Sequence, residues 1–204
     1  MPTPLGHALG GMAAGWLVCR SMLPGWHATI FRPWSRADPH DPAVRMHPSI
    51  NLSTVALSGV LYAVVGIAPD LDLLVGAHST YTHSVGAVGL AFLTAFAVSR
   101  RPRVAAAVAA AWASHLLLDW LGSDTSPPIG IMALWPFSRE HYQSSFYVFE
   151  AVSRRYWLPE QFVWGNLKAA LKEVLILGSV AGVSYWMTTV NHRGTGTQRT
   201  HRSD

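Results

Sequence analysis

Five apolar stretches alternate with polar or proline-rich connections along the chain. They cover residues 5–23, 52–67, 84–98, 104–121 and 170–190, and each has 15 to 21 residues. Small residues are frequent in them, as in membrane helices whose backbones pack closely, and the alternation typical of β-strands is rare. Each stretch comes close to the ~20 residues that cross a bilayer. The pattern predicts an all-α protein, a multi-pass helical membrane bundle of about five helices.

The domain organisation follows from chain length and from the connections. We expect a single helical membrane domain over residues 1–190, because the chain is short for two independent domains. A loop-rich, aromatic insertion is expected at 122–167, and its aromatic side chains could form an interfacial belt or cap a soluble core. Residues 191–204 have the polar and basic composition of a disordered tail.

Composition narrows the class of protein and of site. Half of the residues are apolar and 13% are charged, against roughly 25% charged residues in a soluble domain. The basic residues form short clusters without a continuous stripe, so nucleic-acid binding is not expected. Cys19 is the single cysteine, which excludes a disulfide within the chain and a thiolate zinc cluster. The N-terminus lacks the basic region of a secretory signal, and we expect it to be retained as a helix.

Ionisable side chains are rare in the apolar stretches, and those present fall near one end of the predicted bundle. If the helices run alternately up and down, Pro69 should end or kink the second helix. Extended backbone beyond it would turn the two following aspartates the same way. Six side chains then arrive at one end: His7, Asp70, Asp72, His83, His115 and Asp119. Each would cost several kcal/mol to bury unpaired.

This set has two interpretations. The side chains could pair privately, as His115 with Asp119 one helical turn later, or they could bind a shared cation. A single pair favours the first interpretation, and all six together favour the second. These ligand types suit zinc, and less well manganese or iron. Six histidines of loops and tail are expected to be solvated: His27, His40, His47, His78, His192 and His201.

The basic residues gather at the opposite end of the predicted bundle. Ten of the fifteen lie there: Arg20, Arg32, Arg36, Arg45, Arg100, Arg101, Arg103, Arg193, Arg199 and Arg202. By the positive-inside rule, this end and the basic tail would face the cytoplasm. The His/Asp end would then face outward.

Four segments together resemble the YdjM-like family of bacterial inner-membrane proteins, which are described as membrane-bound metal-dependent hydrolases. They are "TPLGHALGG", "GIAPDLDLL", "YTHSVGAVG" and "SHLLLDWLGSDTSPPIGIMALWPFS", and the resemblance covers His7 to Ser138. It implies multi-pass insertion in the bacterial inner (cytoplasmic) membrane.

The same motifs are similar to those of the zinc-dependent phospholipase C and single-strand nuclease superfamily, which has an all-α metallohydrolase fold. That similarity implies a first zinc bound by Asp70 or Asp72 with His83, His115 and Asp119. A second zinc would be held by His7 and by a bridging Asp119. The superfamily has a further histidine where this chain has Thr125, and no HxxxE motif follows, so we expect one or two divalent ions and not three.

The function expected is hydrolysis of an ester or phosphoester bond in a lipid or amphiphilic substrate by a metal-activated water. Asp70, Asp72 and Thr125 are the catalytic candidates. Whichever aspartate does not ligate could act as a general base or fix a histidine tautomer, supported by Ser84, Ser114 and Thr125. One alternative is a non-enzymatic membrane protein whose His/Asp cluster binds a structural ion or links helices. Another is a soluble domain with the same chemistry.

Overall fold

The computed structural model describes residues 1–21, 52–75, 78–125, 127–153 and 156–190. Within these ranges it is helical and contains no β-strand, which confirms the all-α prediction. The α-helices are α1 (Pro4–Ser21), α2 (Leu52–Ile67), α3 (Val85–Ser99), α4 (Pro102–Trp120), α5 (Asn166–Glu173) and α6 (Ser179–Val190). Two 3₁₀ segments are η3 (Ala68–Val75) and η4 (Tyr81–His83), and two π-helical segments are η5 (Gln161–Gly165) and η6 (Val174–Gly178). The predicted tail at 191–204 lies outside the described residues.

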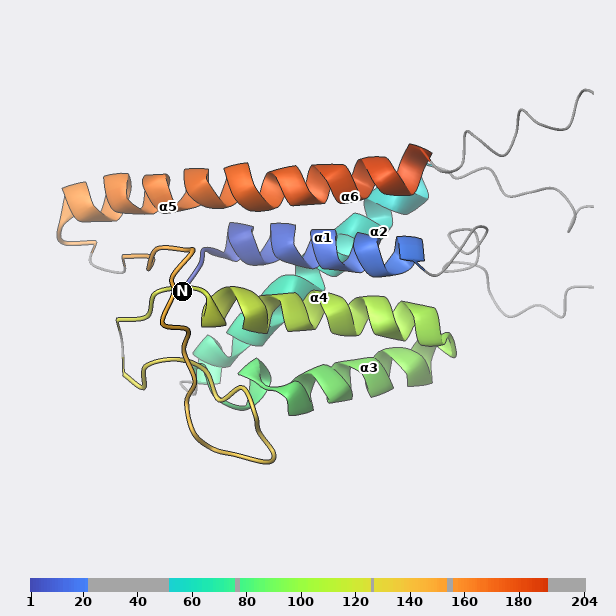
Figure 1. Cartoon of the computed structure of the whole chain (residues 1–204), viewed down its shortest axis with the longest axis horizontal. Helices are drawn as coiled ribbons and strands as arrows, with labels where there is room; N and C mark the ends of the chain where they lie inside the picture. The colour runs from blue at the N-terminus through green and yellow to red at the C-terminus, as the bar shows by residue number, and fades with distance from the viewer. Residues whose placement is uncertain (22–51, 76–77, 126, 154–155, 191–204) are drawn as a thin grey trace, which may run out of the picture.

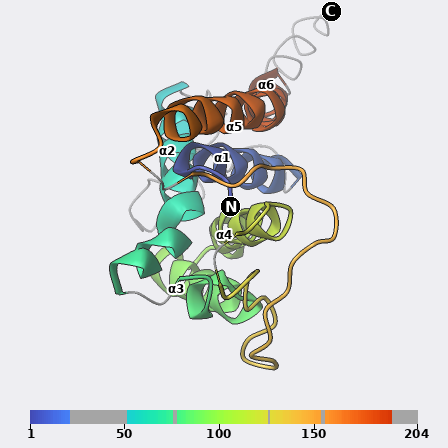
Figure 2. The ribbon, with the colours of Figure 1, turned by 90° about the vertical axis from the view of Figure 1, so that its left-hand side faces the viewer.

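Helix α1 lies in the middle of the bundle and packs against α2, α4 and α6 (Figures 1 and 2). Its contact with α2 is made backbone to backbone. A Cβ atom on Gly11 would lie 2.4 Å from the carbonyl oxygen of Tyr62, and one on Gly66 would lie 2.4 Å from that of His7. Two glycines therefore let the helices approach as closely as the frequent small residues predict.

The chain after α2 follows the prediction from Pro69 in part. Helix α2 ends at Ile67, just before the proline, and the chain continues as the 3₁₀ helix Ala68–Val75. The expectation of extended backbone was therefore wrong. A 3₁₀ helix has about three residues per turn, so side chains two positions apart diverge. Asp70 and Asp72 accordingly have different partners, as described below.

The C-terminal helix is longer than predicted. The segments η5, α5, η6 and α6 follow one another without a break from Gln161 to Val190. The predicted aromatic insertion therefore ends before residue 167. The sequence of α5, NLKAALKE, is too polar to stand out as an apolar stretch. Its Leu, Lys, Ala and Glu residues are nevertheless good helix formers, which explains the earlier start.

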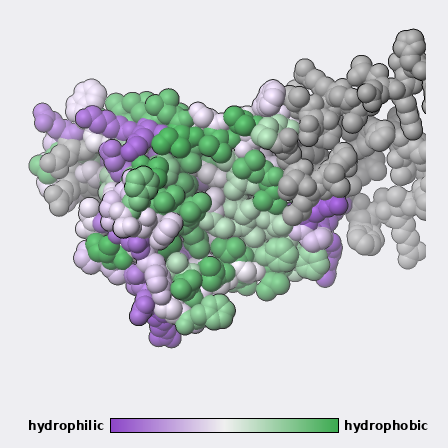
Figure 3. All heavy atoms as spheres, in the orientation of Figure 1, coloured by the Kyte–Doolittle hydropathy of each residue, from purple (hydrophilic) through white to green (hydrophobic). Residues whose placement is uncertain are grey.

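Apolar surface is extensive in this structure. Among the described residues, one helical segment is long and apolar enough to cross a membrane, Val55–Leu74, and Val85–Ser99 is apolar but shorter. Helix α3 contains no buried residue. In the view of Figure 3, hydrophobic residues cover the middle of the molecule, and hydrophilic residues gather towards its ends. By length and composition, one segment thus meets the requirement for a membrane span.

Candidate metal centre

Four separate segments bring histidines and aspartates together at the end of the bundle where α1 and α3 begin and α4 ends (Figure 1). His7 lies near the start of α1, Asp70 in η3 and His83 in η4. His115 and Asp119 lie one turn apart near the end of α4. We call these five residues the His/Asp cluster. Alternating helix directions explain why positions so distant in sequence meet.

Asp119 lies at the centre of the His/Asp cluster. Its Oδ1 is 3.3 Å from Nε2 of His7, and its Oδ2 is 3.1 Å from Nε2 of His115 and 3.3 Å from Nε2 of His83. Both oxygens are buried, and neither has a well-formed hydrogen bond among the described residues. Three imidazoles therefore converge on one carboxylate whose lone pairs are not satisfied. Private His/Asp pairs would leave no such orphaned oxygens.

Asp70 contributes a second carboxylate to the cluster. Its Oδ1 is 3.5 Å from Nε2 of His115 and 3.7 Å from Nε2 of His83. One donor atom each from His7, Asp70, His115 and Asp119 can be chosen so that all lie within 4.8 Å of one another. Ligands of a common zinc ion lie about 2 Å from it, so these four side chains could reach one ion. Its double positive charge would balance the two carboxylates.

The cluster is closed on most sides. The side chains of His7, His83, His115 and Asp119 are at most 1% exposed, whereas that of Asp70 is 19% exposed. Buried charges are stable only when they are paired or coordinate a metal. The burial is therefore consistent with a cation site that meets solvent on the side of Asp70.

Two histidine rings are oriented by partners outside the cluster. Nδ1–H of His115 donates to the carbonyl oxygen of Gly66 at 2.7 Å. Nδ1 of His83 lies 3.2 Å from Oδ2 of Asp72, and the hydroxyl of Thr82 donates to the same oxygen at 2.7 Å. Such outer partners fix the tautomer and orientation of metal-binding histidines. In both rings Nε2 is thereby left facing the cluster.

The carboxylates around His83 also govern its protonation. Burial lowers the pKa of His83, but the nearby carboxylates of Asp119, Asp70 and Asp72 more than offset this effect and raise the pKa to about 11. In the metal-free protein, this ring therefore holds a proton at neutral pH. A bound cation would take the place of that proton, because a histidine ligates only when it is neutral.

Five of the six predicted ligands meet in the cluster, and the sixth does not. Asp72 lies on the far side of His83, in the orienting position that we predicted for whichever aspartate does not ligate. Its role as a ligand stays a prediction. Ser84 caps α3 by accepting from the Ala87 N–H at 3.2 Å, and Ser114 donates to the carbonyl oxygen of its own helix neighbour Ala111.

Thr125, the third catalytic candidate, follows α4 in the loop that leaves the cluster. Its side chain is exposed. Its catalytic role stays a prediction.

His78 is a residue that the sequence analysis missed, because we expected it to be solvated. Its side chain is only 19% exposed, and its Nδ1 donates to Oδ1 of Asp72 at 3.0 Å. Its ring also meets that of His83 edge-on, with 5.0 Å between the ring centroids. The only sequence signal was its place five residues before His83. The other histidines grouped with it lie outside the described residues: His27, His40, His47, His192 and His201.

The arginine-rich end is described in part. Arg100, Arg101 and Arg103 lie at the junction of α3 and α4, at the end of these helices opposite the cluster (Figure 1). Six of the remaining predicted members lie outside the described residues: Arg32, Arg36, Arg45, Arg193, Arg199 and Arg202.

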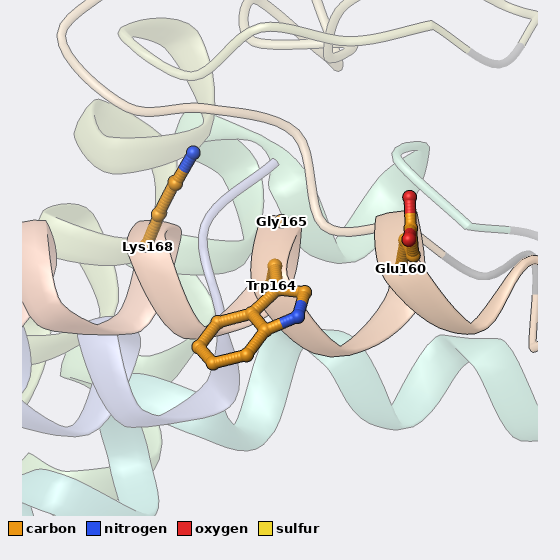
Figure 4. Close-up of a pocket in the computed structure, with 4 residues that line it drawn as sticks. All are labelled: Glu160, Trp164, Gly165 and Lys168. Carbon is orange, nitrogen blue, oxygen red and sulfur yellow. The ribbon is translucent and has the colours of Figure 1, made fainter.

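A surface pocket occurs at the start of the C-terminal helix, lined by Glu160, Trp164, Gly165 and Lys168. Figure 4 shows Glu160 and Lys168 projecting from the same side of the helix and Trp164 from another side. None of these residues belongs to the His/Asp cluster. The pocket is therefore separate from the candidate metal centre.

Comparison with known proteins gives one match. The sequence model of a family described as YdjM inner membrane protein matches residues 1–194. No curated protein and no solved structure gives a significant match to the chain. The similarity to the phospholipase C and nuclease superfamily stays a prediction.

Proposed function

The chain belongs to the YdjM inner membrane protein family, and from this premise we propose that it is a membrane-bound metal-dependent hydrolase. Its proposed substrate is a lipid or another amphiphile with an ester or phosphoester bond. The cofactor is a divalent cation, with zinc preferred because the donors are imidazoles and carboxylates.

The observation that carries the proposal is the state of Asp119. Its two oxygens are buried without hydrogen bonds, and imidazole nitrogens of three histidines lie 3.1 to 3.3 Å from them. A carboxylate in such a place is strongly unfavourable unless protons on the neighbouring imidazoles or a cation balance its charge. A cation among these side chains would replace those protons and use the lone pairs that the protein leaves free.

The residues of the cluster have different roles in the proposed reaction. A divalent cation, when bound, lowers the pKa of a coordinated water and polarises the bond to be cleaved. His7, His115 and Asp119 would hold it in the buried part of the centre. Asp70 would complete this set of ligands from the solvent side, where its side chain is 19% exposed. Asp72 keeps the ring of His83 in position.

Multi-pass insertion is part of the proposal. Apolar side chains that are 52% to 83% exposed lie on both helices: Leu57, Val60 and Val64 on α2, and Leu90, Leu93 and Val98 on α3. These apolar faces suit contact with lipid. The arginine-rich end would lie in the cytoplasm and the cluster would face outward, close to the membrane surface, where an amphiphilic substrate is available.

A second candidate function is supported by the burial of the cluster. With four of its five side chains at most 1% exposed, the cluster could hold a structural ion in a non-enzymatic membrane protein. A structural site has no coordination position open to solvent, whereas a catalytic site keeps one open. Access of water to the bound ion therefore separates the two functions.

The test uses the full chain purified in detergent and loaded with zinc. We expect bound zinc by elemental analysis and hydrolysis of p-nitrophenyl esters or phosphoesters with acyl chains. Asp119→Asn keeps the shape of the side chain and removes its charge, and should lower zinc affinity by roughly 100-fold and abolish hydrolysis. Glu140→Gln removes an exposed acid in the loop after α4 and should change neither.

Two results would argue against the proposal. Wild-type protein without bound metal would remove its basis. Stoichiometric zinc without hydrolysis of either substrate class would favour the structural ion.

A further inference from the structure

We propose that the centre binds two cations, with the carboxylate of Asp70 between them. This inference rests on the metal centre of the proposed function and adds a second, outer site to it. The inner site consists of His7, Asp70, His115 and Asp119. The outer site consists of Asp70, His78 and His83.

The donor atoms fall into two groups that share one residue. In each group, one donor atom per residue can be chosen so that all lie within 4.8 Å of one another. Asp70 is the only residue common to both groups. A carboxylate has two oxygens and can give one to each ion, which is how paired ions about 3.5–4 Å apart are commonly held in hydrolytic sites.

The two histidines of the outer site, His78 and His83, are oriented by a neighbouring carboxylate, as metal-binding histidines commonly are. Asp72 places Oδ1 3.0 Å from Nδ1 of His78 and Oδ2 3.2 Å from Nδ1 of His83. The hydroxyl of Thr82 donates to this carboxylate as well. One carboxylate therefore fixes both rings through Nδ1, as outer-shell carboxylates do in metal centres. The other nitrogen of His78, Nε2, lies 3.1 Å from Sδ of Met1, a contact that the outer cation would replace. This explains why Asp72 is 7% exposed although it belongs to neither donor group.

Exposure assigns different roles to the two sites. In the inner site, the side chains of His7, His115 and Asp119 are at most 1% exposed. In the outer site, the side chains of Asp70 and His78 are each 19% exposed. The outer cation is thus the one that solvent and substrate reach, while the inner cation is enclosed by α1 and α4.

The proposal predicts the number of ions bound to each chain. Full-length protein in detergent is saturated with Zn²⁺, passed through metal-free buffer and analysed for zinc and protein content. Wild-type protein should retain two ions per chain, and His78→Ala should retain one. His141→Ala alters a histidine of the loop after α4 that belongs to neither donor group and should retain two.

Manganese gives an independent measurement. Two Mn²⁺ ions bridged by a carboxylate are magnetically coupled, and wild-type protein should show this coupling in its electron paramagnetic resonance spectrum. The spectrum of His78→Gln should be that of a single ion. One ion in the wild type, unchanged in both His78 variants, would overturn the outer site and leave the proposed function standing. No bound ion in the wild type would overturn both.

Discussion

At the scale of single residues, Gly66 connects helix packing to the candidate metal centre. Its missing side chain lets α2 touch the backbone of α1 at His7, and its carbonyl oxygen accepts the hydrogen bond that orients His115. The same residue thus sets the distance between two helices and the direction of one ring.

We expect Gly66→Ala to weaken both stability and metal binding. The added methyl group would lie 2.4 Å from the carbonyl oxygen of His7, so the helices must separate, at a cost of about 1–3 kcal/mol. Thermal unfolding and zinc titration of the purified protein measure the two effects. Gly89→Ala on α3 is the matched control, because a Cβ there meets nothing within 4 Å. Equal effects of both substitutions would refute this role of Gly66.

The protonation of His83 predicts a pH dependence for the metal-free protein. Its pKa is raised from 6.5 to about 11 on folding, so its proton stabilises the folded state fully below about pH 6.5. This contribution is lost as the pH rises towards 11. The melting temperature of metal-free protein should therefore fall across this range, and His83→Gln should reduce the fall. A melting temperature that rises instead would contradict the assignment.

At the scale of secondary-structure elements, the C-terminal helix holds the start of α1. Glu173 is 1% exposed, and its carboxylate accepts hydrogen bonds from the backbone N–H of Thr3 and from the Thr3 hydroxyl. Thr3 in turn accepts from the N–H of Gly6. His7 lies in the same helical turn as Gly6, so this contact anchors the part of α1 that carries a predicted ligand.

Glu173→Ala should destabilise the protein by about 1–3 kcal/mol. The backbone N–H and the hydroxyl of Thr3 would both lose the buried carboxylate that accepts their hydrogen bonds. Thermal unfolding in detergent measures the loss. Glu160→Ala removes an exposed acid from the start of the same continuous helix and should have little effect. If both variants melt at the same temperature as the wild type, Glu173 does not anchor α1.

The sequence predicted the elements better than the local backbone between them. Hydrophobic stretches located α1 to α4 closely, because those helices are apolar over most of their length. Pro69 marked the end of α2, but whether the chain beyond it is extended or 3₁₀ depends on packing that a single sequence does not contain. For the same reason, the sequence did not show which of Asp70 and Asp72 lies among the predicted ligands. His78 was missed because only the turn between η3 and η4 brings it to Asp72.

At the scale of the whole molecule, the proposed orientation can be tested with cysteine labelling. The native Cys19 is 2% exposed, so a maleimide should label it only weakly. Arg103 lies at the start of α4, Glu140 lies in the loop that follows this helix, and both are exposed. In intact spheroplasts, a membrane-impermeant maleimide should label Glu140→Cys and should label Arg103→Cys only after permeabilisation. The reverse pattern would place the cluster on the cytoplasmic side.

The contact between Thr3 and Glu173 also orders events during synthesis. Its partners are separated by 170 positions, and α1 packs against the helix that carries residue 173. A nascent chain that has not yet released residue 173 leaves the donors of Thr3 without this acceptor. His7 therefore reaches its final anchorage only after residue 173 has been made, and we expect metal loading of the proposed centre to follow that point.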